Sequence, residues 1–413
     1  MILAGLTVFL IVCVPVSADT YTVCPTGCNF TNVQDAIDHA SDGDTILVMA
    51  GEYHELLTIN KTLSIRGEDP LSTTINGDHA GNVVSINAQG VTITNLTVRG
   101  SIRFADDDEK WPGYGIGVRF APDVTITGCL VTDCQVGIYG DSSARTTVLK
   151  NAVYGNDAEG VLIEESVSPI VSDNDIHDNL MGILSEAARE GFSCTNNRVL
   201  HNQWSGLSFI DGFENGVIAD NVIENNSYVD FSGVPDYNCA GGYFEFVNNC
   251  TITDNRFVHN GGIGFFISGM SGSVVEGNTM EGNNAGFSYN DGNLNPGNTI
   301  PLTNTVDGLP ILYLEDVSDR DITGNYASIY CIRVRNITLH DVVMDTANGL
   351  GITFRGGKNI NIRDNTVSNN IFQNILLAEV EGAVLSGNRL LYSGYGSGVT
   401  NSYNVTLSDI VTL

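Results

Sequence analysis

The chain has 413 residues, and its 18 basic and 48 acidic groups give it a net charge of −30. Nucleic acid is not an expected partner, because binding to phosphates requires a basic face, whereas cations, basic surfaces and neutral sugars remain open. The hydrophobic content of 42% suffices for a large core and excludes a disordered acidic protein.

The first 18 residues carry no charge and contain an apolar stretch from Leu6 to Val14, followed by small residues at Ser17 and Ala18. This pattern predicts a secretory signal peptide that is cleaved after Ala18. An uncleaved membrane anchor is the alternative, although the apolar run is short for crossing a bilayer. We therefore expect a secreted or cell-surface protein whose mature part comprises residues 19–413.

A short amphipathic helix is predicted at about residues 31–41. Thr31 is the expected N-cap, with Gln34 three residues later, and apolar residues at 33, 36, 37 and 40 share one face. The helix is expected to cap the N-terminal end of the repetitive region that follows it.

A repeat of about 23 residues runs through the rest of the chain. Each copy contains an Asn, an apolar residue two positions later, a second Asn five positions after the first, and then Gly before alternating apolar residues. A period near 23 without a helical pattern fits one coil of a parallel β-helix, in which three short strands are joined by tight turns. The paired positions are Asn151/Asn156, Asn174/Asn179, Asn197/Asn202, Asn221/Asn226, Asn255/Asn260, Asn278/Asn283 and Asn365/Asn370.

The repeat predicts an all-β fold, a right-handed parallel β-helix of about a dozen coils, which forms a single domain over residues 19–413. Equivalent side chains in neighbouring coils then stack about 4.8 Å apart. An inward Asn at the same bend of every coil can pass amide hydrogen bonds along the stack and satisfy buried turn carbonyls. The recurring Asn residues are therefore interpreted as structural rather than catalytic.

The N-terminal region also resembles a known family. The run NVQDAIDHASDGDTILVMAGEYHELLTINKTLSIRGEDP, followed by INGDHAGNVVSINAQGVTITNLTV, looks like the start of NosD-like proteins in the pectin-lyase-like β-helix superfamily. This resemblance covers nearly the whole mature chain and is specific for the fold. It implies little about activity, because the superfamily includes lyases, hydrolases, epimerases, adhesins and surface proteins.

Aligning the coils on the Gly after the second Asn predicts a strip of acids on the outer surface. Asp141, Glu164 and Glu186 lie four residues after this Gly, Asp211 lies five residues after it, and Arg119 takes the position in the preceding coil. Stacked like charges repel each other, so the repulsion between these carboxylates must be reduced by solvent, by a cation or by raised pKa values.

Two positions before the acids, an outward strip that is partly aromatic is expected to be exposed. Aromatic rings beside acids commonly hold sugars, and paired carboxylates serve glycoside hydrolysis. The alternative, which we rank first, is a solvated edge whose acids limit unwanted association. The members of this second strip are Tyr139, Leu162, Leu184, Ser208 and Phe266.

Three insertions are expected to overhang the β-helix, at about residues 101–115, 228–242 and 290–310. The first is rich in hard oxygen ligands that could bind Ca²⁺, but their spacing matches no EF-hand, so an acidic loop without metal is the alternative. The calcium candidates are Asp106, Asp107, Asp108 and Glu109, and the candidates for stacking on sugar rings are Trp111 and Tyr114.

Eight cysteines remain after cleavage of the signal peptide, and an even number in an exported chain favours disulfides. Cys24 and Cys28 form the best local pair, and Cys239 with Cys250 is the second. Cys129 and Cys134 occupy the two Asn positions of one coil, roughly 16 Å apart, and should not pair with each other. Cys194 replaces an apolar strand residue and should be buried.

Seven Asn-x-Ser/Thr sequons make the chain a candidate glycoprotein, although many would arise by chance in a sequence rich in Asn and Thr. They begin at Asn29, Asn60, Asn95, Asn225, Asn249, Asn336 and Asn404.

The first functional hypothesis is a structural or adhesive protein of the cell envelope that binds polysaccharide or other envelope proteins. The second is a lyase, epimerase or hydrolase that uses the acidic strip, although no Asp-Pro-His-Asp or Gly-His-Gly run is present. The segment NVTLSDIVTL at residues 404–413 continues the strand pattern with no visible cap. We therefore expect the C-terminal coil to be an association surface, because open strand edges promote pairing with another chain.

Overall fold

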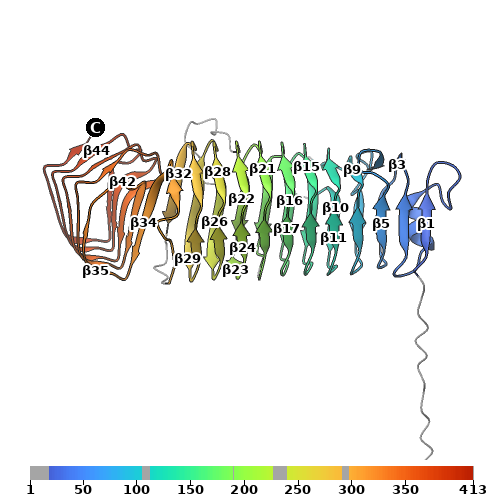
Figure 1. Cartoon of the computed structure of the whole chain (residues 1–413), viewed down its shortest axis with the longest axis horizontal. Coiled ribbons are helices and arrows are strands. Elements are labelled where there is room, and N and C mark those ends of the chain that lie inside the picture. The colour runs from blue at the N-terminus through green and yellow to red at the C-terminus, as the bar shows by residue number, and fades with distance from the viewer. Residues whose placement is uncertain (1–17, 105–111, 189, 227–239, 291–296, 413) are drawn as a thin grey trace, which may run out of the picture.

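The computed structural model describes residues 18–104, 112–188, 190–226, 240–290 and 297–412. They form an elongated stack of coils, with the N-terminal strands at one end and the last strands at the other (Figure 1). Nearly every strand pairs in parallel with its equivalent in the next coil. The prediction of a parallel β-helix is therefore confirmed.

The N-terminal stack has three sheets, which we name A, B and C, and each complete coil contributes one strand to each sheet. Sheet A contains β1 (Thr20–Val23), β2 (Thr45–Val48), β5 (Ser64–Gly67), β8 (Thr92–Thr94), β11 (Thr125–Thr127), β14 (Thr147–Leu149), β17 (Ile170–Ser172), β20 (Ser193–Thr195), β24 (Val217–Ala219), β27 (Thr251–Thr253) and β30 (Val274–Glu276). Sheet C contains β4 (Leu57–Ile59), β7 (Val84–Ile86), β10 (Tyr114–Arg119), β13 (Val136–Asp141), β16 (Glu159–Glu164), β19 (Met181–Glu186), β22 (Leu207–Ile210), β26 (Ala240–Asn248), β29 (Ile263–Ser271) and β32 (Ala285–Asn290), and β23 (Phe213–Glu214) pairs with β26.

Sheet B runs through the whole molecule. Its strands in the N-terminal stack are β3 (Gly51–His54), β6 (Thr73–Asn76), β9 (Thr97–Arg99), β12 (Leu130–Thr132), β15 (Ala152–Tyr154), β18 (Asp175–His177), β21 (Arg198–Leu200), β25 (Val222–Glu224), β28 (Arg256–Val258), β31 (Thr279–Glu281) and β33 (Thr305–Val306). It continues with β34 (Leu309–Glu315), β36 (Ser328–Ile332), β39 (Leu350–Arg355), β42 (Gln373–Ala378) and β45 (Ser397–Thr400).

The C-terminal stack begins at β34, where the chain reverses. Strands β33 and β34 pair antiparallel across Asp307 and Gly308, whose φ angles of 47° and 80° are typical of a tight hairpin turn. Two further sheets complete these coils. Sheet D contains β35 (Ser318–Ile322), β37 (Arg335–His340), β40 (Lys358–Arg363), β43 (Glu381–Ser386) and β46 (Tyr403–Ser408), and sheet E contains β38 (Val343–Met344), β41 (Thr366–Ser368), β44 (Arg389–Leu391) and β47 (Val411–Thr412).

The number of coils exceeds the expected dozen, because sheet B has 16 strands. The paired-Asn motif is largely missing from the C-terminal stack, so the repeat count misses several of its coils.

The third predicted insertion, at about residues 290–310, also differs from the expectation. Residues 298–306 continue the stack instead of overhanging it: Asn304 accepts a hydrogen bond from the amide of Asn278, and β33 pairs with β31. In the second insertion, residues 240–242 already belong to strand β26.

The predicted helix is present as α1 (Val33–His39), but its cap differs from the expectation. The N-cap residue is Asn32, not Thr31, and its side chain makes no capping hydrogen bond. The carboxylate of Glu55, from the next coil, instead accepts the backbone N–H groups of Val33 and Gln34 at 2.9 Å each. A negative charge at this position also stabilises the positive end of the helix dipole.

The Asn ladders form as predicted. In the ladder that contains Asn174, Asn197 and Asn221, each side-chain amide donates to the oxygen of the next Asn and to a carbonyl of the preceding coil. Cys129 and Cys134 lie at the starts of the two ladders, where their backbone N–H groups donate to Asn151 and Asn156. The predicted coil register is therefore confirmed.

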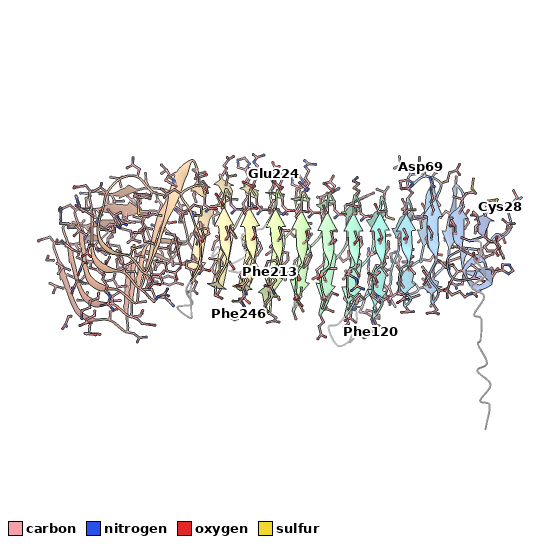
Figure 2. The ribbon with its side chains drawn as sticks, turned by 60° about the horizontal axis from the view of Figure 1, so that its bottom comes forward. Cys28, Asp69, Phe120, Phe213, Glu224 and Phe246 are labelled. Carbon is pink, nitrogen blue, oxygen red and sulfur yellow. A yellow bond between two sulfur atoms is a disulfide. The ribbon has the colours of Figure 1, made fainter. Side chains whose placement is uncertain are left out.

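The residue before each Asn of the seven pairs named above turns the chain at a positive φ angle. Asp, Asn and Gly dominate these corners because they tolerate the left-handed region best. Phe213 is buried inside the stack, whereas Phe120 and Phe246 lie at one edge of it (Figure 2).

The cysteine predictions are confirmed in part. Cys24 and Cys28 form a disulfide, and Cys129, Cys134 and Cys194 are separate buried thiols. The second expected bridge is wrong, because Cys250 is a free buried thiol that packs in the core; Cys239 lies outside the described residues.

We expect the buried thiols to resist alkylation in the folded protein. Burial raises the pKa of Cys129 and Cys134 to about 11 and that of Cys194 to about 12, so the reactive thiolate is scarce at neutral pH. Site-resolved mass spectrometry after iodoacetamide treatment should show these cysteines modified only after denaturation. Rapid modification of Cys194 in the native protein would contradict its placement in the core.

Candidate functional site

The outer surface of sheet C carries the side chains that were expected to form an exposed aromatic strip. This expectation is wrong in one respect, because the strip is buried: Tyr139 is 0% exposed, Leu162 6% and Phe266 4%. Their side chains pack against equivalents in neighbouring coils, as the stacked rings of Tyr114 and Tyr139 show at a centroid distance of 5.7 Å. Stacking at the coil spacing lets these large side chains cover one another, so they form packed clusters and not an open aromatic surface.

The acids beside this strip form a column. Backbone register aligns Arg119 with Asp141, Asp141 with Glu164, and Glu164 with Glu186. Asp211 is not the next member of the column, because Ile210 pairs with Glu186. Asp211 lies one residue further on.

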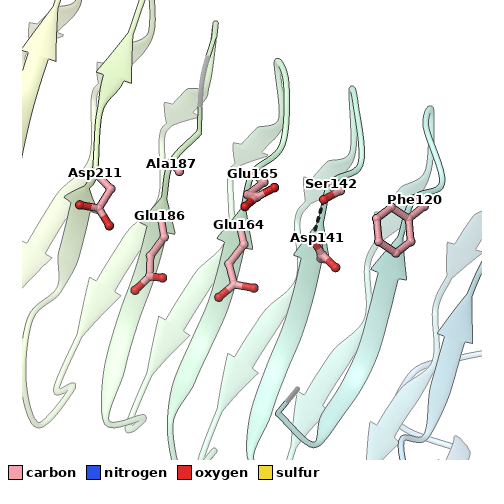
Figure 3. A pocket seen from close by; sticks show the side chains of 8 residues that line it. All are labelled: Phe120, Asp141, Ser142, Glu164, Glu165, Glu186, Ala187 and Asp211. Carbon is pink, nitrogen blue, oxygen red and sulfur yellow. Dashed lines mark hydrogen bonds between the residues drawn. The ribbon is translucent and has the colours of Figure 1, made fainter. Parts of the chain in front are cut away.

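A second column, of which the sequence analysis named only Asp211, occupies the corners directly after the acids. Its members all have positive φ angles, so each turns its coil out of sheet C. Figure 3 shows the two columns side by side in adjacent coils. The second column could have been found in the sequence by comparing the residues that directly follow the aligned positions. The corner residues are Phe120, Ser142, Glu165, Ala187 and Asp211.

Together the two columns line a surface groove of about 470 Å³, which we call the acidic groove. It comprises Phe120, Asp141, Ser142, Glu164, Glu165, Glu186, Ala187 and Asp211. Phe120 is 67% exposed and provides an apolar surface at one end.

Two carboxylates of the acidic groove accept hydrogen bonds from neighbouring side chains. Asp141 is 4% exposed, and it accepts hydrogen bonds from Ser142 Oγ at 2.8 Å and from Arg119 Nε at 3.4 Å. Glu164 accepts a hydrogen bond from the hydroxyl of Tyr139 at 2.5 Å. Burial and this bond raise the pKa of Tyr139, so its hydroxyl stays protonated as a donor.

The remaining acids are open to a ligand. Among the described residues, no hydrogen-bond partner is found for the carboxylates of Glu186 and Asp211, and burial raises the pKa of Glu186, with further contributions from Glu164 and Asp211. Burial also raises the pKa of Glu159, at the other end of β16, again with contributions from Glu186 and Glu164. Glu159 was not predicted from the sequence, because it lies outside the aligned positions.

The raised pKa of Glu186 predicts a pH-dependent gain in stability for Glu186→Gln. Folding raises the pKa, so between its unfolded and folded values the folded state binds more protons and stability falls as the pH rises. Glutamine does not titrate, so the variant keeps the stability that the wild type loses as the pH rises. The variant should melt at a higher temperature than the wild type at pH 8, and the difference should shrink towards pH 4. Exposed Glu276→Gln serves as the control, and equal behaviour of the two variants would contradict the prediction.

The loop expected to bind calcium, with Asp106 to Glu109 and Trp111, lies outside the described residues, so calcium binding stays a prediction. Of its aromatic candidates, Tyr114 is described and is buried in β10. Of the seven sequon asparagines, Asn95 is half-buried and the other six are exposed, and glycosylation stays a prediction. In the described parts of the chain, no helix is long and apolar enough to cross a membrane.

A family model confirms the resemblance found in the sequence. The model of NosD, described as a periplasmic copper-binding protein, matches residues 37–238 and 296–411, which is more than half of the chain. The chain belongs to the NosD family. A periplasmic family protein is consistent with an extracytoplasmic location, whereas export to the cell surface stays a prediction.

Solved structures with similar folds belong to proteins with different activities. The Dettilon tailspike protein is 15% identical with a TM-score of 0.48, over 89% of this chain and 64% of the tailspike, so the NosD-family chain spans less than two thirds of its length. An Azotobacter vinelandii mannuronan C-5 epimerase A-module is 13% identical with a TM-score of 0.37, over 92% and 93% of the two chains. The pectin methylesterase PemA from Erwinia chrysanthemi is 14% identical with a TM-score of 0.38, over 58% and 79%. No curated protein matches the chain.

Copper, which the family description names, does not fit the described residues. They contain no group of three or more His, Cys, Asp or Glu side chains placed to hold a metal ion. Thiolates are soft ligands that suit copper, but the free cysteines are buried at separate positions and burial raises their pKa values. We therefore derive no function from copper for this chain.

Proposed function

We propose that this NosD-family chain is an extracytoplasmic envelope protein with a structural or adhesive role, which binds a polysaccharide carrying amino groups in the acidic groove. The observation that carries the proposal is the pair formed by Glu186 and Asp211, two carboxylates in one groove for which the described residues supply no hydrogen-bond donor. Carboxylates held close together are relieved by a cationic ligand that donates hydrogen bonds to them.

The charge of the groove favours amino sugars over uronic acids. Protonated amino groups and hydroxyls of an amino sugar would donate to Glu186 and Asp211, while Phe120 offers an apolar surface for a ring. A uronate polymer would bring further negative charges to a chain whose net charge is −30.

Calorimetric titration with glucosamine hexasaccharide tests the proposal. The double variant Glu186→Gln/Asp211→Asn should weaken binding at least about tenfold, since it removes two charge-assisted contacts. The control variant Glu276→Gln/Glu281→Gln removes the same charge from exposed positions in sheets A and B and should bind like the wild type. Equal losses in the two variants, or preferred binding of galacturonate hexasaccharide, would overturn the proposal.

A carbohydrate-active enzyme is the second candidate, and the raised pKa values of Glu186 and Glu159 favour it. A raised pKa lets a carboxyl hold its proton at a higher pH than usual, which is the property that a general acid needs. Incubation with acidic and neutral polysaccharides, followed by assays for unsaturated products and reducing ends, tests this candidate. Turnover that Glu186→Gln abolishes would establish an enzyme, and no turnover on any polymer would leave the binding role.

Self-association through the C-terminal coil is a separate proposal. The coil formed by β45, β46 and β47 carries exposed apolar side chains, with Val399 44%, Leu407 59% and Val411 45% exposed. A second copy docked there would bury them. Light scattering should detect dimers of the wild type and monomers of a form that lacks residues 403–413, and a wild-type monomer at high concentration would refute this proposal.

A further inference from the structure

A second pocket, of about 210 Å³, lies on the same outer face at the junction of the two stacks. The outer face of sheet C continues across the junction, because backbone hydrogen bonds join each coil to the next. The N–H of Gly349 donates to Phe287 O, that of Phe372 to Gly349 O, and that of Tyr395 to Phe372 O. The C-terminal stack thus places Phe372 and Tyr395 beyond the end of sheet C.

The lining of this pocket differs from that of the acidic groove. Three aromatic side chains, Phe266, Phe372 and Tyr395, line it together with the uncharged polar side chains of Ser288 and Gln373. Among the described residues that line it, none is charged, although the net charge of the chain is −30. Tyr395 is 71% exposed. Aromatic rings with a few amide and hydroxyl groups suit a neutral, hydroxyl-bearing ligand.

Ser288 is a buried polar residue of this lining. This residue is 1% exposed and lines the pocket. It lies over Gly349, where an added Cβ would come within 2.4 Å of the hydroxyl oxygen. The hydroxyl of Ser288 can donate a hydrogen bond to a bound sugar or accept one from it.

We propose that this pocket is a second subsite, which holds an uncharged sugar ring of the polysaccharide whose amino groups occupy the acidic groove. The inference rests on the proposed function and extends it to a partly N-acetylated amino-sugar polymer. Glu186 in β19 and Phe266 in β29, the lining residue nearest to the acidic groove, are three coil steps apart along sheet C, or about 14 Å at the strand spacing. A hexasaccharide along the stack would reach both sites, whereas a disaccharide would not.

The test compares ligand lengths in calorimetric titrations of the full chain. The probes are a partly N-acetylated glucosamine hexasaccharide and a glucosamine disaccharide. Tyr395→Ala should weaken hexasaccharide binding about tenfold and leave the disaccharide unchanged, since only the longer probe reaches the ring. Gln373→Ala should weaken the hexasaccharide in the same way. Tyr403→Ala removes another exposed tyrosine, 57% exposed, and is the matched control.

The outcomes separate the two proposals. If the acidic groove variant Glu186→Gln/Asp211→Asn loses both probes while Tyr395→Ala binds both like the wild type, the groove stands and the second subsite is refuted. Equal losses in Tyr395→Ala and Tyr403→Ala would also refute the subsite. If neither probe binds the wild type, the proposed function itself fails.

Discussion

Replacing Asn197 with alanine is expected to lower the free energy of unfolding by about 3–5 kcal/mol. Its side-chain amide donates to Val171 O at 2.8 Å and to Asn221 Oδ1 at 3.0 Å, and its oxygen accepts two hydrogen bonds from Asn174. Alanine leaves several of these buried groups without a partner. Urea denaturation followed by circular dichroism measures the loss.

The neighbouring variant Asn196→Gly is the matched control. Asn196 is exposed and has a φ angle of 56°, a conformation that glycine adopts without strain. We expect its stability to change by less than about 0.5 kcal/mol. If Asn197→Ala cost no more than Asn196→Gly, the ladder would not stabilise the stack.

Tyr330→Ala should cost about 3–5 kcal/mol and should uncouple the two stacks. Tyr330 is fully buried at the start of the C-terminal stack, where its ring lies edge-on to Phe287 and Tyr289 at centroid distances of 5.7 Å. These two rings belong to β32 of the N-terminal stack. Because solenoid coils are stabilised mainly by their neighbours, loss of this contact should split one unfolding transition into two.

Two variants control for this result in scanning calorimetry. Tyr330→Phe keeps the ring and loses only the hydroxyl that accepts the N–H of Tyr289, so it should cost about 1 kcal/mol. Exposed Tyr403→Ala should change stability by less than about 0.5 kcal/mol. A single transition in Tyr330→Ala, with a melting temperature equal to that of Tyr403→Ala, would show that the junction does not couple the stacks.

The sequence predicted the N-terminal stack well because its physical signals are local and repeated. Asn residues at fixed spacing, such as Asn174 and Asn197, mark bends that must recur in every coil. The C-terminal stack lacks most of these pairs, and the antiparallel reversal at Asp307 and Gly308 depends on a single short turn. Pattern counting therefore underestimated the coils and treated residues 298–306 as a loop.

The candidate site was predicted only in part. Alternation along each strand placed Asp141, Glu164 and Glu186 in one column, because side-chain direction follows the pleat. Burial of Tyr139 and the corner position of Asp211 could not be predicted in this way. Both depend on how side chains from neighbouring coils fill the outer face and on where each strand ends.

A crystal structure of the chain with bound glucosamine hexasaccharide tests the proposed site most directly. Density for the sugar should follow the acidic groove from Phe120 to Asp211, with an amino nitrogen within hydrogen-bond distance of the Glu186 or Asp211 carboxylate. A hexasaccharide bound to the outer surface of sheet A or sheet B, with the groove vacant, would contradict the assignment of the acidic groove as the binding site.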